Sequence, residues 1–189
     1  MTTVIIAVVI ITAVLVIAGV IAGLVIDRYK KRRRVREDFG PEYHRTLART
    51  GDSSKAQKEL EERQKRVASF DLKPLAAADA QRFSDQWRRT QEAFVDDPKV
   101  ATSSADRLVQ EVMQARGYPM SDFDQRAADI SVDHPQVVQN YRSAHQISEA
   151  NDRGEANTED LRQAFVHYRS LFIDLLETED ERVEASRSR

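Results

Sequence analysis

The sequence predicts an all-α protein, with one N-terminal transmembrane helix followed by a cytoplasmic helical bundle of about five helices. Three observations support this prediction. The first 26 residues carry no charged side chain and are almost wholly apolar. Further along the chain, apolar side chains recur at spacings of three and four residues, which is the period of an amphipathic helix. No run of residues shows the strict apolar–polar alternation of a half-buried strand.

Residues 1–26 are assigned to a transmembrane anchor. The uncharged run from Val4 to Ile26 forms a helix of about 35 Å, which crosses a hydrocarbon core of roughly 30 Å with some tilt. A cleaved signal peptide is the main alternative, but it has basic residues before a shorter apolar run and small residues after it. Here no basic residue precedes the run and a basic cluster follows it.

Residues 27–36 form a basic juxtamembrane collar with seven Lys or Arg residues and one Asp. Positive charge beside a span favours the cytoplasmic side, so the N-terminus is expected outside and the C-terminal domain in the cytoplasm. Such clusters also attract anionic lipid head groups, by about 1 kcal/mol per residue. The expected membrane-surface residues are Arg28, Lys30, Lys31, Arg32, Arg33, Arg34 and Arg36.

Gly19 and Gly23 form a pair of small residues one helical turn apart within the span. This spacing lets two helix backbones approach closely. The pair therefore makes homo-oligomerisation through the transmembrane helix a hypothesis.

The overall charge of −2 hides an asymmetry, because residues 37–189 contain 22 basic and 30 acidic residues. This acidic composition argues against a nucleic-acid partner, which needs a basic face. The absence of cysteine excludes disulfides, thiolate zinc sites and cysteine nucleophiles.

Residues 37–74 are interpreted as a polar helical spacer. Pro41 can open a short helix that ends at Gly51, and Asp52 or Ser53 offers a cap for the next one. The segment 54–69 has only a thin apolar stripe, as expected for a spacer or a partner-binding helix. Its predicted ion pairs, at the favourable spacing of four residues, are Glu59/Arg63, Glu61/Lys65 and Glu62/Arg66.

Residues 75–178 are expected to form the bundle, and residues 179–189 a disordered tail. Helix starts are predicted at Asp96-Asp97-Pro98, at a Ser121–Asp124 capping box, at Asp133–Pro135 and at Asn157 or Thr158. The last helix carries a stripe at alternating steps of four and three residues, formed by Leu161, Phe165, Tyr168, Phe172 and Leu175.

The residues that could support catalysis show no pattern typical of an enzyme. No phosphate-binding glycine loop is present, and none of the four histidines shows HExxH spacing. The acidic pairs lie at helix starts, where the helix dipole stabilises negative charge. We expect no catalytic residues, no cofactor and no metal site. The candidate pocket between helices would involve Trp87, Tyr141, His145 and Tyr168.

Six sequence strings resemble an uncharacterised family of bacterial single-pass membrane-anchored proteins. The resemblance runs from Phe39 to about Leu176. It implies the topology described above and a bacterial source, and it assigns no activity to any residue. The strings are FGPEYHRTL, LKPL, FVDDP, ADRLVQEVMQARGYP, RAADISVDHPQVVQNYRSAH and TEDLRQAFVHYRSLF.

The leading functional hypothesis is a membrane-tethered interaction or scaffold module at the inner face of the membrane. Its unknown protein partner would bind the bundle or the spacer helix. The alternative is a sensor that binds a small molecule or lipid between bundle helices. A third hypothesis, a metal-dependent hydrolase, requires carboxylates and histidines that cluster in the bundle.

Overall fold

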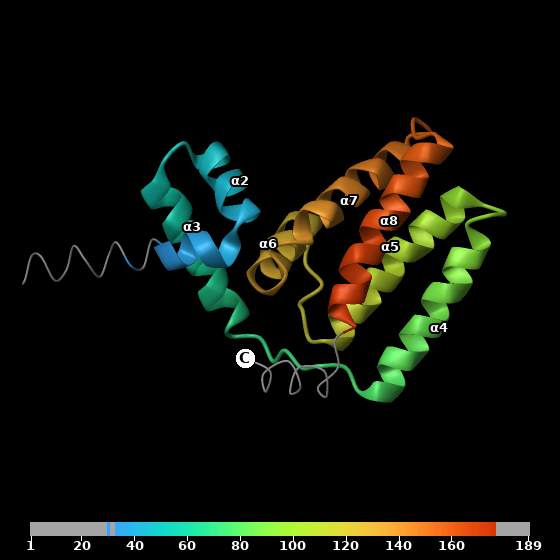
Figure 1. The fold of residues 1–189 in the computed structure, drawn as a ribbon, viewed down its shortest axis with the longest axis horizontal. Helices are drawn as coiled ribbons and strands as arrows, with labels where there is room; N and C mark the ends of the chain where they lie inside the picture. The colour runs from blue at the N-terminus through green and yellow to red at the C-terminus, as the bar shows by residue number, and fades with distance from the viewer. Residues whose placement is uncertain (1–29, 31–32, 177–189) are drawn as a thin grey trace, which may run out of the picture. The chain divides into compact units, whose positions relative to one another are not determined.

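The computed structural model describes residue 30 and residues 33–176 (Figure 1). The predicted span Val4–Ile26 with Gly19 and Gly23 lies outside them, as do collar residues Arg28, Lys31 and Arg32 and the tail 179–189. None of the described helices is long and apolar enough to cross a membrane.

All regular structure in the described part of the chain is helical, so the all-α class is confirmed there. Residues 33–39 are helical as well. Between residues 75 and 176 there are five helices. The helices are α2 (Pro41–Thr50), α3 (Ser53–Val67), α4 (Ala77–Ala93), α5 (Pro98–Ala115), α6 (Phe123–Asp133), α7 (Val138–Asp152) and α8 (Thr158–Leu175).

The chain divides into two compact units, residues 1–38 and residues 39–189. In the first unit, the described residues include an ion pair between Arg33 and Glu37, whose nitrogen and oxygen lie 2.7 Å apart. Both side chains are largely exposed. The second unit contains all of the helices named above, and it is the unit that carries the sites discussed below.

In the second unit, α4, α5, α8 and α7 lie side by side in that order (Figure 1). Helix α8 packs along both α5 and α7, which explains why its apolar stripe is continuous. The five predicted stripe residues are all buried, which confirms that helix face: Leu161, Phe165, Tyr168, Phe172 and Leu175.

Aromatic rings fill the contact between α4 and α8. The Trp87 ring stacks on Phe172, with centroids 4.5 Å apart, and lies 5.0 Å from Phe165. Phe94 contacts Phe165 from the other side at 5.1 Å. Because aromatic side chains bury large apolar areas, these contacts are a main source of cohesion for the bundle.

The helix ends follow capping chemistry. Asp52 accepts hydrogen bonds from the backbone N–H groups of Ser54 and Lys55, both at 2.8 Å. Asn157 and Asp160 form a reciprocal capping box at the start of α8. These results confirm the predicted starts of α3 and α8.

Two predicted helix starts were wrong by one to three residues. Helix α6 begins at Phe123, so its cap is Asp122, whose carboxylate accepts the Gln125 N–H at 2.9 Å, and not Ser121. Helix α7 begins at Val138 because residues 135–137 form a turn.

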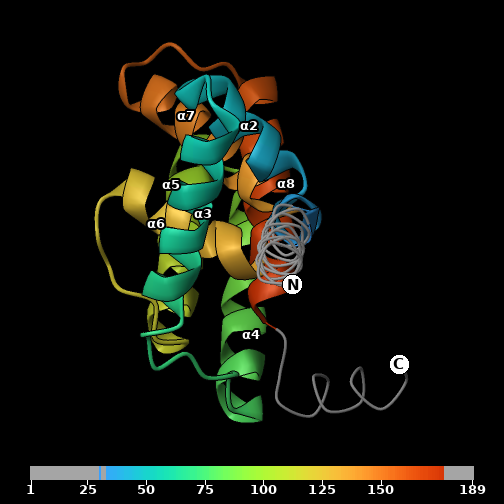
Figure 2. The same cartoon turned by 90° about the vertical axis from the view of Figure 1, so that its left-hand side faces the viewer.

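Helices α2 and α3 form a hairpin, and α3 packs against α6 (Figure 2). The thin stripe of α3 is its buried face: Ala56 and Leu60 are fully buried, and Val67 nearly so. The segment that the sequence suggested as a spacer therefore has tertiary contacts of its own.

Two neighbouring positions on α8 test this packing. Phe165→Ala should lower the free energy of unfolding by about 3 to 5 kcal/mol, because it empties a site between Trp87 and Phe94. Val166→Ala is the matched control and should change it by less than about 0.5 kcal/mol, since Val166 is 51% exposed. Urea unfolding followed by circular dichroism measures both, and equal effects would contradict the packing of α8.

Candidate functional site

A buried carboxylate joins the α2–α3 hairpin to α7. The side chain of Glu42, on α2, is fully buried. Arg142 of α7 donates to both carboxylate oxygens at 3.0 Å. Arg63 of α3 donates to Oε1 at 2.8 Å, and Gln139 of α7 donates to Oε2 at 3.0 Å. Four hydrogen bonds therefore compensate the cost of removing this charge from water.

Positive charge exceeds negative charge immediately around Glu42. Burial lowers the pKa of Arg142, the Glu42 carboxylate raises it, and the like charges of Arg45 and Arg63 lower it further. The net result is a pKa below the usual range for arginine. Two guanidinium groups thus bind the buried carboxylate, and the charge of Arg45 acts on one of them, Arg142.

Glu59 extends this network on α3. Burial raises the pKa of Glu59, but hydrogen bonds from Arg49 and Arg63 outweigh burial and lower it. The predicted pair Glu59/Arg63 is present, with nitrogen and oxygen 2.5 Å apart. The Arg63 guanidinium therefore bridges Glu59 to the buried Glu42.

The predicted ion pair between Glu62 and Arg66 was wrong. Arg66 does not pair with Glu62, because its Nε donates to the buried carboxylate of Asp129 on α6 at 3.0 Å. Gln125 donates to the same oxygen at 2.7 Å. Two buried carboxylates, from α2 and α6, therefore accept hydrogen bonds from arginines of α3.

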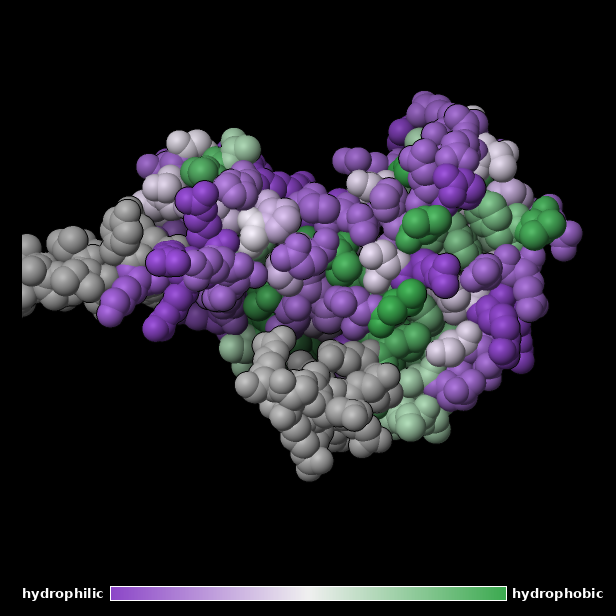
Figure 3. Space-filling view, in the orientation of Figure 1, coloured by the Kyte–Doolittle hydropathy of each residue, from purple (hydrophilic) through white to green (hydrophobic). Residues whose placement is uncertain are grey.

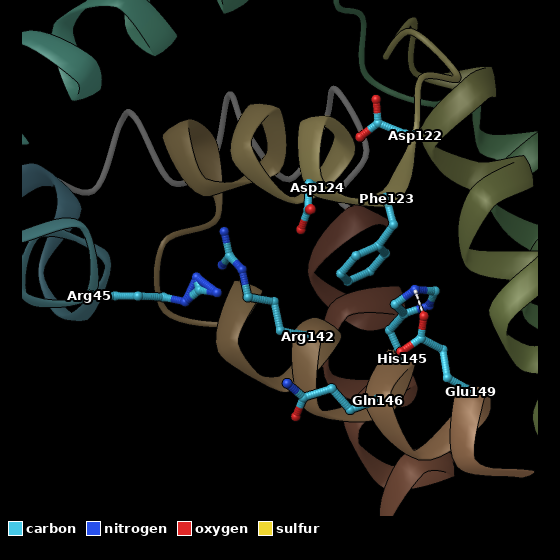
Figure 4. A pocket seen from close by; sticks show the side chains of 8 residues that line it. All are labelled: Arg45, Asp122, Phe123, Asp124, Arg142, His145, Gln146 and Glu149. Atoms are coloured by element: carbon cyan, nitrogen blue, oxygen red, sulfur yellow. Dashed lines mark ion pairs between the residues drawn. The ribbon is translucent and has the colours of Figure 1, made fainter. Parts of the chain in front are cut away.

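An open pocket of about 490 Å³ lies beside the Glu42 network (Figure 4). Arg45 lines it from α2, and the side chains of Arg45 and Arg142 extend toward one another across one end. The residues that line it from the start of α6 are Asp122, Phe123 and Asp124, and those from α7 are Arg142, His145, Gln146 and Glu149.

The other end of the pocket is aromatic. The Phe123 and His145 rings stack with centroids 3.5 Å apart and an angle of 14° between their planes. His145 Nε2 lies 3.7 Å from Glu149 Oε1, so the two form an ion pair when the imidazole is protonated. The pocket thus combines a guanidinium pair with a flat ring surface.

The four residues of the predicted pocket are not brought together as one lining. Only His145 lines the pocket. Tyr141 and Tyr168 are fully buried and contact each other edge to face, with centroids 6.3 Å apart. Trp87 is 6% exposed and stacks within the α4–α8 contact.

Both buried tyrosine hydroxyls interact with charged side chains. Arg126 donates to the Tyr141 hydroxyl at 3.4 Å. Burial raises the pKa of Tyr168, and the Asp106 carboxylate adds to this effect. Both tyrosines are therefore neutral at physiological pH and serve as core residues with polar tips.

Among the residues that the structure describes, no three His, Cys, Asp or Glu side chains are grouped so that they could hold a metal ion. His134 is occupied instead by Asp174, whose Oδ2 lies 2.5 Å from its Nδ1. This contact ties the end of α6 to the last turn of α8.

Sequence reasoning missed the residues that build this site, above all Glu42, Arg45 and Arg142. An acidic residue just after Pro41 has the pattern of an ordinary first-turn acid. The one local signal lies on α7, where Arg142 follows Val138 by four residues and so shares its buried face.

Comparisons of the chain with protein-family models, with curated proteins and with solved structures give no match.

The Glu42 network predicts a large effect of a small change. Glu42→Gln should lower the free energy of unfolding by about 3 kcal/mol, because it leaves buried arginines without their counter-charge. Glu62→Gln, on the exposed side of α3, should change it by less than about 0.5 kcal/mol. Chemical denaturation of both variants is the measurement. A value for Glu42→Gln as small as that for Glu62→Gln would show that the carboxylate is not buried as described.

Trp87 is the one tryptophan of the chain and reports on the core. Acrylamide should quench its fluorescence weakly in the folded protein and strongly in urea, because the indole is enclosed by Phe165 and Phe172. Compounds that occupy the pocket at Phe123 and His145 should leave Trp87 emission unchanged. Ready quenching in the folded state would instead place a solvent-filled cavity beside Trp87.

Proposed function

We propose that this protein is a membrane-tethered helical interaction module that binds another protein through its bundle. The proposal is supported by the distribution of exposed apolar side chains. Five large apolar side chains are exposed among the described residues, and four of them come from α8 and the α4–α5 turn. They are Val166 and Ile173 on α8, and Val95 and Val100 beside the turn.

These residues define the proposed partner face. Figure 3 shows apolar surface over α8 and near the α4–α5 turn, with hydrophilic surface around it. Exposed apolar surface rimmed by charge is typical of protein-binding sites. The α3 helix is the weaker candidate, because Glu59, Arg63 and Arg66 are occupied by internal ion pairs.

The proposed location is the inner face of a bacterial cell membrane, with the bundle in the cytoplasm. The apolar run at residues 4–26 and the basic collar support it. Anionic lipid head groups are the proposed contact of the collar. A reporter that works only in the cytoplasm, fused after Arg189, should be active; a silent reporter would reverse the topology.

Site-specific photo-crosslinking in the native membrane tests the partner face. A photo-reactive amino acid at Ile173 should give one discrete adduct, and the same group at Glu62 on α3 should give none. Adding Val166→Lys should reduce the Ile173 adduct while helical content stays unchanged, because an exposed position costs little stability. Adducts from Glu62 alone would show that the partner binds α3 and not the face on α8.

A second candidate function is a small-molecule sensor, and the pocket between α2, α6 and α7 favours it. The pocket has side chains from both the hairpin and the bundle. A ligand bound there would contact elements that are far apart in the sequence, and pockets between bundle helices are common ligand sites. In this reading, ligand binding changes how the protein engages its partner.

A further inference from the structure

We propose that Arg45 and Arg142 form a binding site for the carboxylate of a small molecule, bridging α2 and α7 at one end of the pocket. The inference rests on the second candidate function, the sensor, and names the ligand chemistry of its site.

Both guanidinium groups have donors to spare. A guanidinium carries five N–H donors. Glu42 takes one from each terminal nitrogen of Arg142. Arg45 makes no hydrogen bond or ion pair with a described residue, and it is exposed in the pocket wall. The two side chains converge there (Figure 4), so one ligand can accept from both.

The charge at the end of the pocket formed by Arg45 and Arg142 favours an anion. Arg45 and Arg63 both act on Arg142 as like charges, and Glu42 is the fully buried carboxylate that Arg142 binds. An anion placed between Arg45 and Arg142 would relieve this repulsion. It would also keep Glu42 in its present bonds, since it uses donors that Glu42 does not.

The carboxylates of the pocket decide the class of anion. Asp122 is committed to the cap of α6, and Glu149 lies beside His145. Asp124 makes no ion pair with a described residue and shares the lining with Arg142. Its negative charge disfavours a polyanion such as a phosphate dianion. Arg142 already holds one carboxylate through two parallel bonds, and its unused N–H groups can donate to a second one.

The test is a titration of the full chain in detergent micelles with sodium acetate, with sodium chloride at equal ionic strength as the reference. Thermal melting followed by circular dichroism should show a saturable rise of Tm with acetate, because a ligand that binds only the folded state stabilises it. Hydrogen exchange should slow in α2 and α7 and stay unchanged in α4.

Arg45→Gln is the decisive variant, since Arg45 is exposed and its loss should leave the fold intact. It should raise the apparent Kd for acetate by about tenfold, the expected effect of losing one charge-assisted hydrogen bond. The matched control is Arg153→Gln, which removes another exposed arginine at the end of α7 and should leave the Kd unchanged.

Three results would overturn the inference. The first is a rise of Tm with acetate that is no larger than with chloride. The second is a rise of Tm with acetate that is equal for the wild type and Arg45→Gln. A larger Arg45-dependent effect of inorganic phosphate than of acetate would also reject the carboxylate class. The sensor function fails on a separate observation: acetate binds through Arg45, yet the crosslinking yield at Ile173 does not change with acetate.

Discussion

The buried carboxylate of Glu42 is the constraint on which the arrangement of the hairpin depends. Taking an ion out of water costs several kcal/mol, and partners with good geometry must offset that cost. Here the partners come from α3 and α7, so the carboxylate is satisfied only when α2, α3 and α7 are all in place. Such a contact forms as a whole or not at all. It also sets the direction of α2 and thereby holds Arg45 at the pocket wall.

The bundle and the α2–α3 hairpin of the second unit are stabilised by different interactions. The bundle is held by apolar burial, which is strong but weakly directional. The hairpin has a smaller apolar contribution, from Ala56, Leu60 and Val67, and depends more on ion pairs to Glu42 and Asp129. Buried ion pairs contribute less net stability than apolar packing of similar size, but a buried charge that loses its partner is strongly destabilising. The position of the hairpin therefore depends on the geometry of these ion pairs.

The sequence was sufficient for what depends on local patterns. The stripe of α8 and the caps at Asp52 and Asn157 follow from spacings within one or two turns, and the structure confirms them. The site depends on contacts that have no local pattern. Glu42 meets Arg63 across 21 positions and Arg142 across 100. Arg66 is a second example. The spacing of four residues predicts a pair with Glu62, but in the fold Arg66 pairs with Asp129, and burial of that carboxylate strengthens the charge interaction.

The pocket and the proposed partner face are connected by packed aromatic rings. Phe123 contacts Tyr141 at 5.0 Å, and Tyr141 contacts Tyr168 on α8. Val166 and Ile173 lie on the outer side of the same helix. Spatial connection alone does not establish coupling, because a ligand shifts an equilibrium only by its difference in affinity for two states. The sensor proposal therefore requires that the contact of the α2–α3 hairpin with α7 supplies these two states. A carboxylate that bridges Arg45 and Arg142 favours the docked hairpin, so it affects α8 to the extent that docking changes the packing of α7 against it.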